Sequence, residues 1–367
     1  MSEVYEMYDV QPEHIGRGRG AMVLHTDKGI RQVRAVTVSE SRLAAEYEFK
    51  ERLCEAGYTY TDRLVKNTDG DLVTYDRYGN PFAMRMYFEG REMNVQNRQE
   101  ILLAVDNLVE LHRAGREAWK LSESDMQLRE KNDLRRRNRE LKRIIHYVAK
   151  QSPKREFEAL YMKAFPYFYA QGLACEKAEA GEDSETQPMT EAIGTGMTQP
   201  VTEAIGTGMT QPMSELVENR EWQADRHIGY CHGSYNYHSV LICPGEAHVA
   251  TINFDRFHVG NQLQDLYYFM RKTVEKNGYS FELLTAILQQ YHKGCPLGQE
   301  DFAYIYGLYR YPEKFYKLSN QYMNSNKNRI SPKMIEKLNR IIEEEEKKQA
   351  LLEKMNIFAS HLQNNLV

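Results

Sequence analysis

Hydrophobic and polar positions follow two different patterns along the chain, one before residue 90 and one after it. In the first part, short apolar runs at 22–24 and 31–36 flank a polar turn and predict a strand-turn-strand unit. An apolar spacing close to that of a helix follows over residues 41–56. Three further runs complete a small antiparallel sheet and lie at residues 64–65, 72–75 and 82–88.

After residue 90 the apolar residues recur every three or four positions, the period of a helix that packs one face into a core. The pattern predicts helices over residues 95–112, 131–150, 157–168, 281–291, 302–306 and 311–322. A last helix begins at Ser331-Pro332, because proline is tolerated in the first turn of a helix. A small antiparallel sheet followed by helices is an α+β fold.

The predicted helix over residues 131–150 carries lysine and arginine laid over an apolar stripe. Such a face is either a solvated outer surface or a contact surface for an acidic partner or nucleic acid. No stacking aromatic residues are interleaved with the basic ones, which disfavours nucleic acid. We therefore interpret this face as solvated.

A twelve-residue repeat interrupts the helical pattern, because residues 186–197 return almost unchanged at 198–209 and a third copy starts at residue 210. Threonine, glycine and proline dominate the repeat, and each unit has too few apolar residues to bury a face. We interpret residues 178–216 as a disordered surface insertion, with an adhesive tract as the alternative.

The stretch from residue 231 to 272 predicts a hairpin between two loops. Residues 240–243 are apolar, Pro244-Gly245 supplies a turn, and residues 249–254 return as a second strand. Kinase-like phosphotransferases use this layout: the loop before the hairpin carries the acid that orients the attacking hydroxyl, and the loop after it carries the aspartate that holds magnesium.

The first loop resembles the H-G-D-x-x-x-x-N catalytic loop of aminoglycoside- and choline-kinase-like enzymes. His232 and Gly233 match this pattern, whereas Ser234 stands at the position of the catalytic aspartate. Ser239 stands at the position of the metal-binding asparagine. A serine hydroxyl is a neutral ligand and does not accept a proton at neutral pH as a carboxylate does. Both functional positions of this loop are therefore altered.

The second loop, residues 252–255, resembles the I-D-F-D magnesium motif of the same enzymes. Asn253 replaces the first aspartate and Asp255 is retained, so we expect no metal site. Asp265 matches the aspartate that braces the catalytic loop from the following helix in these enzymes.

The resemblance also places a phosphate-gripping cation on the third strand and a glutamate partner on the following helix. Arg34 is the match for that cation, although its planar guanidinium differs from the compact ammonium of lysine. Glu46 is its expected partner, with Glu48 or a purely solvated acid as alternatives. We interpret the glycines of residues 16–20 as an ordinary turn that precedes the strand pair. A vestigial nucleotide site is expected at Arg34, Glu46, Asn253 and Asp255.

Over nearly its whole length the chain resembles the CotS-type spore coat protein family, a group with a kinase-like fold. The blocks that carry this resemblance lie at 90–92, 140–142, 232–239, 253–255, 265–272 and 311–315. It implies a bilobal protein-kinase-like fold with a small antiparallel-sheet N-lobe and a mostly helical C-lobe. The expected boundaries are 1–89 for the N-lobe, 90–177 and 217–330 for the C-lobe on either side of the insertion, and 331–367 for the terminal helix.

Composition sets further limits. The 367 residues are 41% hydrophobic and 27% charged, which is enough for one large or two modest domains, and the net charge of −4 gives no global field for nucleic acid or membrane. No apolar run long enough to cross a membrane and no apolar signal region occur. The five scattered cysteines have no metal-ligand spacing and indicate reduced thiols. With the resemblance, these limits predict the cytoplasm of the sporulating cell and assembly onto the spore coat.

We predict a non-catalytic, pseudokinase-like structural or interaction protein whose partners are other spore coat proteins, with no nucleic-acid or membrane partner and no cofactor. The 25 tyrosines suit interfaces and oxidative cross-linking, although half-buried packing explains them as well. The alternative is a small-molecule kinase of the aminoglycoside or choline kinase type with a rewired site, in which Asp255 reaches a metal and His238 acts as the base. A pocket that binds ATP and magnesium without transfer also stays open.

Overall fold

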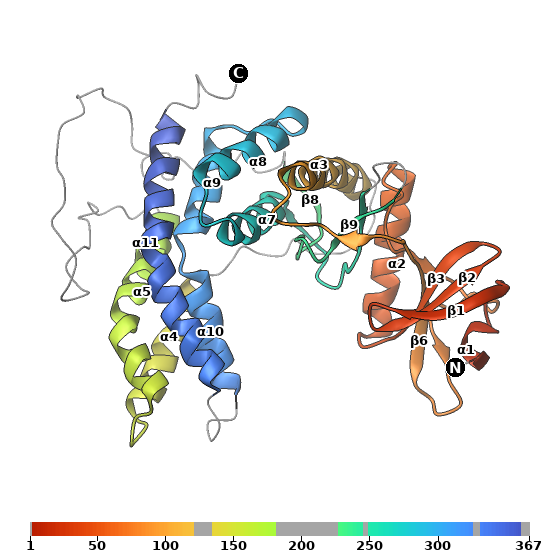
Figure 1. Cartoon of the computed structure of the whole chain (residues 1–367), viewed down its shortest axis with the longest axis horizontal. Coiled ribbons are helices and arrows are strands. Elements are labelled where there is room, and N and C mark those ends of the chain that lie inside the picture. The colour runs from red at the N-terminus through yellow and green to blue at the C-terminus, as the bar shows by residue number, and fades with distance from the viewer. Residues whose placement is uncertain (1, 121–133, 181–226, 245–248, 326–330, 361–367) are drawn as a thin grey trace. The chain divides into compact units, whose positions relative to one another are not determined.

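The computed structural model describes residues 2–120, 134–180, 227–244, 249–325 and 331–360 (Figure 1). The chain divides into two compact units. The first unit contains Met1–Arg129, Ala224–Asn277 and Glu282–Pro296, and the second contains Glu130–Gln223, Gly278–Phe281 and Leu297–Val367. The twelve-residue repeat, and with it residues 181–216 of the expected insertion, lies outside the described residues.

The first unit begins with a short helix and an antiparallel sheet. These elements are α1 (Ser2–Tyr5), β1 (Pro12–Gly18), β2 (Ala21–Thr26), β3 (Gly29–Ala35), β4 (Leu64–Val65), β5 (Thr74–Tyr75) and β6 (Pro81–Met86). The strands lie in the order β1-β2-β3-β6-β4, with β5 also paired to β6. Leu24, Val33 and Met84 from three neighbouring strands are buried together with Val4 of α1. The expected antiparallel-sheet N-terminal part is confirmed.

The interpretation of the glycine-rich stretch as a turn ahead of the strands is wrong. Gly16 and Gly18 lie within β1 and pair with β2, and Arg19-Gly20 forms the turn between the two strands. β1 is an edge strand whose residues are mostly exposed, so it lacks the alternation of apolar and polar residues that reveals a strand in sequence. The glycine-rich stretch therefore links a strand pair.

The helix expected over residues 41–56 is confirmed as α2 (Glu40–Glu55). Ser39 caps it, because the Ser39 hydroxyl oxygen accepts a hydrogen bond from the N–H of Arg42 at 3.3 Å. Leu43 is buried against Leu64 of β4 and Ala83 of β6. Residues that follow Leu43 at helical spacing on α2 therefore also face the sheet.

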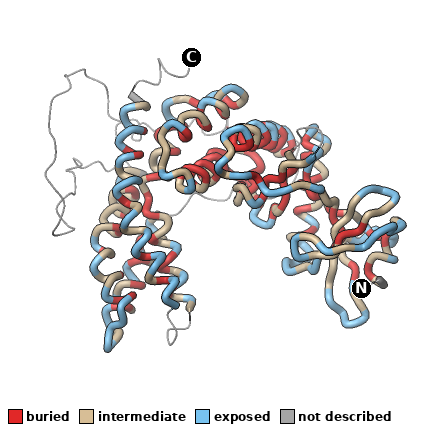
Figure 2. The backbone as a smooth tube through the Cα atoms, in the orientation of Figure 1, coloured by how far each residue is buried: buried red, intermediate tan, exposed pale blue. Residues whose placement is uncertain are grey.

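The rest of the first unit contains the elements that follow the N-terminal sheet. They are β7 (Arg91–Glu92), α3 (Arg98–Lys120), β8 (Ile228–Cys231), β9 (Val240–Ile242), β10 (Val249–Thr251), β11 (His258–Asn261), α7 (Leu263–Lys276) and α8 (Phe281–Gly294). β9 and β10 form the expected antiparallel hairpin, β7 pairs with β9, and β8 pairs with β11. Figure 2 shows buried residues recurring along α3 and α7, as expected of helices that line a core.

The described part of the second unit is helical. Its helices are α4 (Leu134–Ala149), α5 (Glu156–Ala180), α9 (Gln299–Arg310), α10 (Glu313–Asn324) and α11 (Pro332–Ser360). Their core contains stacked aromatic rings, with centroids 4.5 Å apart for Phe168 and Phe315 and 4.9 Å apart for Phe157 and Tyr322. The expected helical C-terminal part is thus confirmed. Among the described residues, no helix has the length and apolar content that a membrane crossing requires.

Candidate functional site

The loop between β8 and β9, residues 232–239, is held by one buried carboxylate. Asp265 in the first turn of α7 accepts a hydrogen bond from the N–H of His232 at 2.6 Å and another from the N–H of Gly233 at 2.8 Å. Burial alone would raise the pKa of Asp265, but the interaction with the His112 side chain opposes burial and the pKa is lowered. Asp265 is therefore ionised at neutral pH, and it braces the loop as the sequence predicts.

His232 ties the loop to the neighbouring strand and is not available as a base. Its Nδ1 lies 3.2 Å from the N–H of Ser234 and must accept that hydrogen, so Nε2 carries the proton and donates to the carbonyl oxygen of Ile252 at 3.0 Å. The ring is fully buried, and this burial lowers the pKa of His232. His232 therefore stays neutral and acts as a structural residue.

The two serines that replace functional residues bond within the loop. The Ser234 hydroxyl lies 3.3 Å from Nδ1 of His232. Ser239 is buried, and its hydroxyl donates to the carbonyl oxygen of Asn236 at 2.8 Å while it accepts from the N–H of Asn236 at 2.9 Å. The Ser239 hydroxyl is therefore used to close the loop on itself, and the loop presents no carboxylate at either altered position.

The loop after β10 is joined to α2 through Arg42. Asn253 has a positive φ of 66°, a conformation uncommon for residues other than glycine, and its N–H lies 3.4 Å from Oδ2 of Asp62. Further along, Arg42 donates to the carbonyl oxygens of Asp255 at 3.3 Å and Phe257 at 2.6 Å. The guanidinium carbon also lies 3.7 Å from the ring centroid of Phe257. Arg42 thus fixes the backbone of this loop and leaves the Asp255 carboxylate exposed.

Glu46 belongs to a buried network of two acids and two bases. Lys50 Nζ lies 2.6 Å from Glu46 Oε1 and 2.6 Å from Asp62 Oδ1. Arg85 on β6 donates to both carboxylate oxygens of Glu46, at 2.5 and 3.1 Å. The side chains are between 0% and 11% exposed, so each charge depends on its partners for stabilisation.

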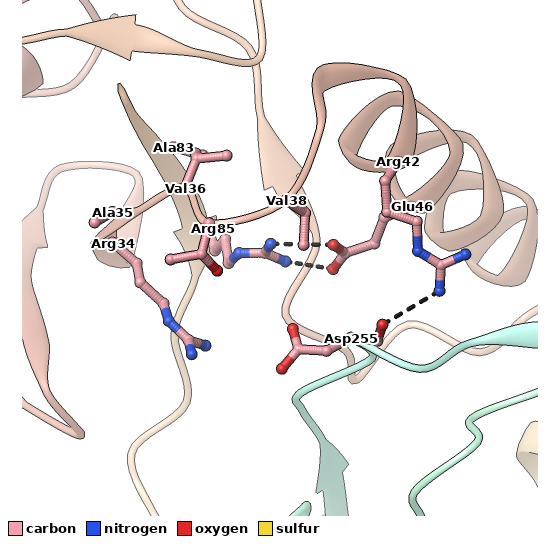
Figure 3. Close-up of a pocket in the computed structure, with 10 residues that line it drawn as sticks. Arg34, Ala35, Val36, Val38, Arg42, Glu46, Ala83, Arg85 and Asp255 are labelled. Atoms are coloured by element: carbon pink, nitrogen blue, oxygen red, sulfur yellow. Dashed lines mark hydrogen bonds and ion pairs between the residues drawn. The ribbon is translucent and has the colours of Figure 1, made fainter. Parts of the chain in front are cut away.

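The expected pairing of Glu46 with Arg34 is therefore wrong. Leu43, one turn earlier on α2, packs on Ala83 of β6, so Glu46 faces Arg85 on that strand and not Arg34 on β3. Arg34 is exposed, and in Figure 3 the guanidinium bonded to Glu46 is that of Arg85 and not that of Arg34. Sequence reasoning missed Lys50, Asp62 and Arg85.

A pocket brings together three of the four residues expected at the vestigial nucleotide site. It is lined by Arg34, Arg42, Glu46, Arg85 and Asp255, together with residues 35–38 and Ala83 (Figure 3). Asn253 is not among the residues that line it. The pocket walls thus carry three arginines against two carboxylates, one of which is bonded to Lys50 and Arg85.

The residues present do not fit magnesium, the metal that the kinase resemblance implies. Magnesium takes oxygen ligands in near-octahedral geometry, usually with one or two carboxylates. Glu46 is already bonded to two cations, the Ser239 hydroxyl is engaged within its loop, and three arginines beside Asp255 repel a dication. In the described part of the chain, no group of three or more His, Cys, Asp or Glu side chains could hold a metal ion.

Several solved structures have a fold similar to that of this chain. The aminoglycoside phosphotransferase from Alicyclobacillus acidocaldarius has a TM-score of 0.73 and 14% identity over 98% of this chain and 96% of that one. A spectinomycin phosphotransferase has a TM-score of 0.60 and 8% identity over 95% of each chain. The choline kinase from Cryptosporidium parvum has a TM-score of 0.52 and 10% identity over 99% of this chain and 94% of that one. The chain therefore has the fold of aminoglycoside phosphotransferases and choline kinases, as the sequence predicts.

The chain also matches one protein family over part of its length. Residues 1–178 match the family described as "Spore coat putative kinase YutH". This match confirms the expected resemblance to spore coat kinase-like proteins over those residues, whereas the loops at 232–239 and 252–255 lie beyond them. Comparison with curated proteins gives no significant match.

Proposed function

We propose that this chain is a non-catalytic, pseudokinase-like structural or interaction protein of the spore coat. One observation carries the proposal: Ser234 and Ser239 stand where the catalytic acid and a metal ligand are expected, and the Ser239 hydroxyl is bonded within its own loop. Phosphoryl transfer requires carboxylates that orient the hydroxyl and neutralise the metal-bound phosphates. A loop without these carboxylates keeps the backbone shape of a catalytic loop but lacks the groups that phosphoryl transfer requires.

The spore coat assignment is supported by the description of the family that residues 1–178 match. We propose that the protein is made in the cytoplasm of the sporulating cell and assembles onto the coat, where other coat proteins are its partners. In this proposal the protein needs no cofactor, because it acts by binding other coat proteins through its surface and not by catalysing a reaction.

A second candidate function, a rewired small-molecule kinase, is favoured by a pair of side chains beside the altered loop. Nδ1 of His238 lies 2.7 Å from Oε2 of Glu92, which fixes the ring and leaves Nε2 as the nitrogen for proton transfer. A histidine oriented by a carboxylate is suited to take a proton from a hydroxyl. Asp255 supplies an exposed carboxylate in the pocket.

Thermal unfolding with ATP and magnesium separates the two functions. The natural chain is compared with a variant that carries Ser234→Asp, Ser239→Asn and Asn253→Asp. The non-catalytic function predicts no magnesium-dependent shift for the natural chain and a gained shift for the restored variant. A magnesium-dependent shift of the natural chain contradicts the proposal and supports the rewired kinase.

Coat assembly provides a test in the cell. Replacing His238 by alanine and Asp255 by asparagine removes the two groups that a rewired kinase needs. The proposed function predicts that a fluorescent fusion of this variant reaches the coat as the natural chain does. Loss of coat fluorescence, with the variant still folded and at normal abundance, would contradict it.

A further inference from the structure

The exposed side of α4 carries a row of positive charges. All exposed residues of this helix except Ala149 are Arg, Lys or His. At about 100° of rotation per residue, these basic residues fall on one arc of about 120° around the helix axis. We call four of them the basic row: Arg135, Arg139, Lys142 and Arg143. Each member lies three or four positions from another, so their Cβ atoms are about 5–6 Å apart.

The basic row has no counter-charge in the described parts of the chain. Its side chains form neither a hydrogen bond nor an ion pair with another described residue. Glu140, the single acid of α4, accepts a hydrogen bond from the Tyr316 hydroxyl at 2.6 Å. Arg137 of the same helix is only partly exposed, and its Nη1 lies 2.5 Å from Oε2 of Glu313. The less exposed charges of α4 are thus paired within the unit, whereas those of the basic row are not.

This arrangement is unfavourable for the isolated helix. Like charges at positions i and i+4 of a helix repel, and Arg139 forms such a pair with both Arg135 and Arg143. Glu at position i and Lys at i+4 stabilise an exposed helix instead, and α11 of the same unit has this spacing at Glu343 and Lys347. The basic row lacks this local stabilisation, which indicates that its counter-charges come from a binding partner.

Three observations select among the anionic partners. Leu141, Ile144 and Val148 form the apolar stripe of α4 and are buried in the core of the second unit, so this helix has no free apolar face to enter a bilayer. The exposed residues of α4 include no aromatic side chain on which a nucleic-acid base could stack. The whole chain carries a net charge of −4, which disfavours an extended polyanion more than a short acidic segment that contacts only the basic row.

We propose that the basic row of α4 is a docking surface for an acidic segment of a partner protein, with carboxylates about 6 Å apart to match the spacing of the row. Guanidinium groups bind carboxylates through two parallel N–H donors, and Lys142 adds a point charge. The inference rests on the proposed function in taking the partner to be a protein, and it adds the surface and the chemistry by which that partner is recognised.

A fluorescently labelled octaglutamate peptide is the probe, and fluorescence anisotropy with the full chain measures its affinity at low ionic strength. The test variant carries Arg135→Gln, Arg139→Gln and Arg143→Gln. Glutamine is a helix former as good as arginine and has no charge, so the substitutions keep the helix and remove only the attraction.

The matched control variant carries Lys333→Gln, Arg340→Gln and Lys347→Gln. These substitutions remove the same amount of charge from exposed positions of α11, which belongs to the same unit as α4. A general effect of net charge on peptide binding would therefore appear in both variants. Thermal unfolding of all three proteins checks the fold.

We predict that the test variant binds octaglutamate about tenfold more weakly than the natural chain and the control variant, because three exposed ion pairs contribute about two- to threefold each. Binding by the natural chain should weaken as salt is added, since the row is exposed. The midpoint of thermal unfolding of the test variant should be no lower than that of the natural chain, because two repelling pairs are removed. Equal affinities for all three proteins overturn the docking surface, and so does an absence of binding by the natural chain.

The same titration with single-stranded oligothymidylate and with vesicles that contain phosphatidylserine tests the other anionic partners. If the natural chain binds either of these more tightly than octaglutamate, and the test variant does not, the assignment to an acidic protein segment is overturned. Failure of the peptide to bind would not bear on the absence of phosphoryl transfer, because the comparison with ATP and magnesium tests residues 234, 239 and 253 and not α4.

Discussion

Replacing Lys50 by methionine keeps a side chain of similar length and removes one charge from a buried network. Lys50 has no exposed side-chain surface, and its ammonium bonds Glu46 Oε1 and Asp62 Oδ1, each at 2.6 Å. The natural network is balanced, with two carboxylates against Lys50 and Arg85. In the variant, two buried carboxylates share one guanidinium, so a net negative charge is left without a partner.

The size of the effect follows from that imbalance. Removing one partner of a buried ion pair costs about 3–5 kcal/mol. For a unit of about 200 residues each kcal/mol lowers the midpoint of thermal unfolding by about 2–4 °C, so we expect a loss of about 6–20 °C. Adding Glu46→Gln to the variant restores the balance of charge and should recover part of the loss.

Thermal and urea unfolding of the full chain test this expectation. The control is Arg98→Met, which breaks an ion pair with Glu282 whose side chains are 57% and 79% exposed, and which should cost less than about 1 kcal/mol. If Lys50→Met unfolds at the same temperature and urea concentration as Arg98→Met, the buried network does not stabilise the first unit.

Three further predictions concern the same fold. Burial alone would raise the pKa of Glu46, but Lys50 and Arg85 outweigh burial and lower this pKa from 4.5 to about 2. The ionised Glu46 therefore stabilises the folded state above pH 4.5, and this stabilisation is lost as the pH falls to about 2. Urea midpoints should therefore fall more steeply over that range for the natural chain than for Glu46→Gln, and parallel curves would contradict this. Asp265→Ala leaves the N–H groups of the buried His232 and the partly buried Gly233 unpaired, so their amide hydrogen exchange should accelerate at least tenfold, whereas unchanged protection would show that these hydrogen bonds do not hold the loop. Phe315→Ala removes a fully buried ring from the core of the second unit and should lower the free energy of unfolding, measured in urea, by about 3–5 kcal/mol. A decrease of less than about 1 kcal/mol would contradict this prediction.

Local patterns in the sequence predict the elements that bury a regular apolar face. The β9-β10 hairpin follows from two apolar runs around a turn, and α2 follows from its spacing. The hydrogen bonds between Asp265 and the loop at residues 232–239 follow from the order of the motifs in the sequence. The helix α7 begins directly after β11, which pairs with β8, so its first turn lies beside the loop that follows β8. β1 could not be predicted in this way, because it is an exposed edge strand and has no apolar face.

The partner of Glu46 could not be predicted in the same way. Arg34 and Arg85 lie on neighbouring strands, and the packing of Leu43 on Ala83 decides which strand α2 faces. A signal for the network was nevertheless present. Glu46 and Lys50 follow Leu43 by three and seven residues on α2, which places both charges on its buried stripe. Charged residues at core positions of a helix indicate buried partners.

The proposed function gives this chain a kinase fold without phosphoryl-transfer activity. The test is a single-turnover incubation of excess protein with γ-labelled ATP, magnesium and an acceptor alcohol, either choline or an aminoglycoside, followed by separation of labelled phosphate and phosphorylated acceptor. We predict no labelled product from the natural chain above the level without protein, for times over which an active aminoglycoside phosphotransferase consumes all the ATP. Transfer of the label by the natural chain, abolished by His238→Ala or Asp255→Asn, would contradict it.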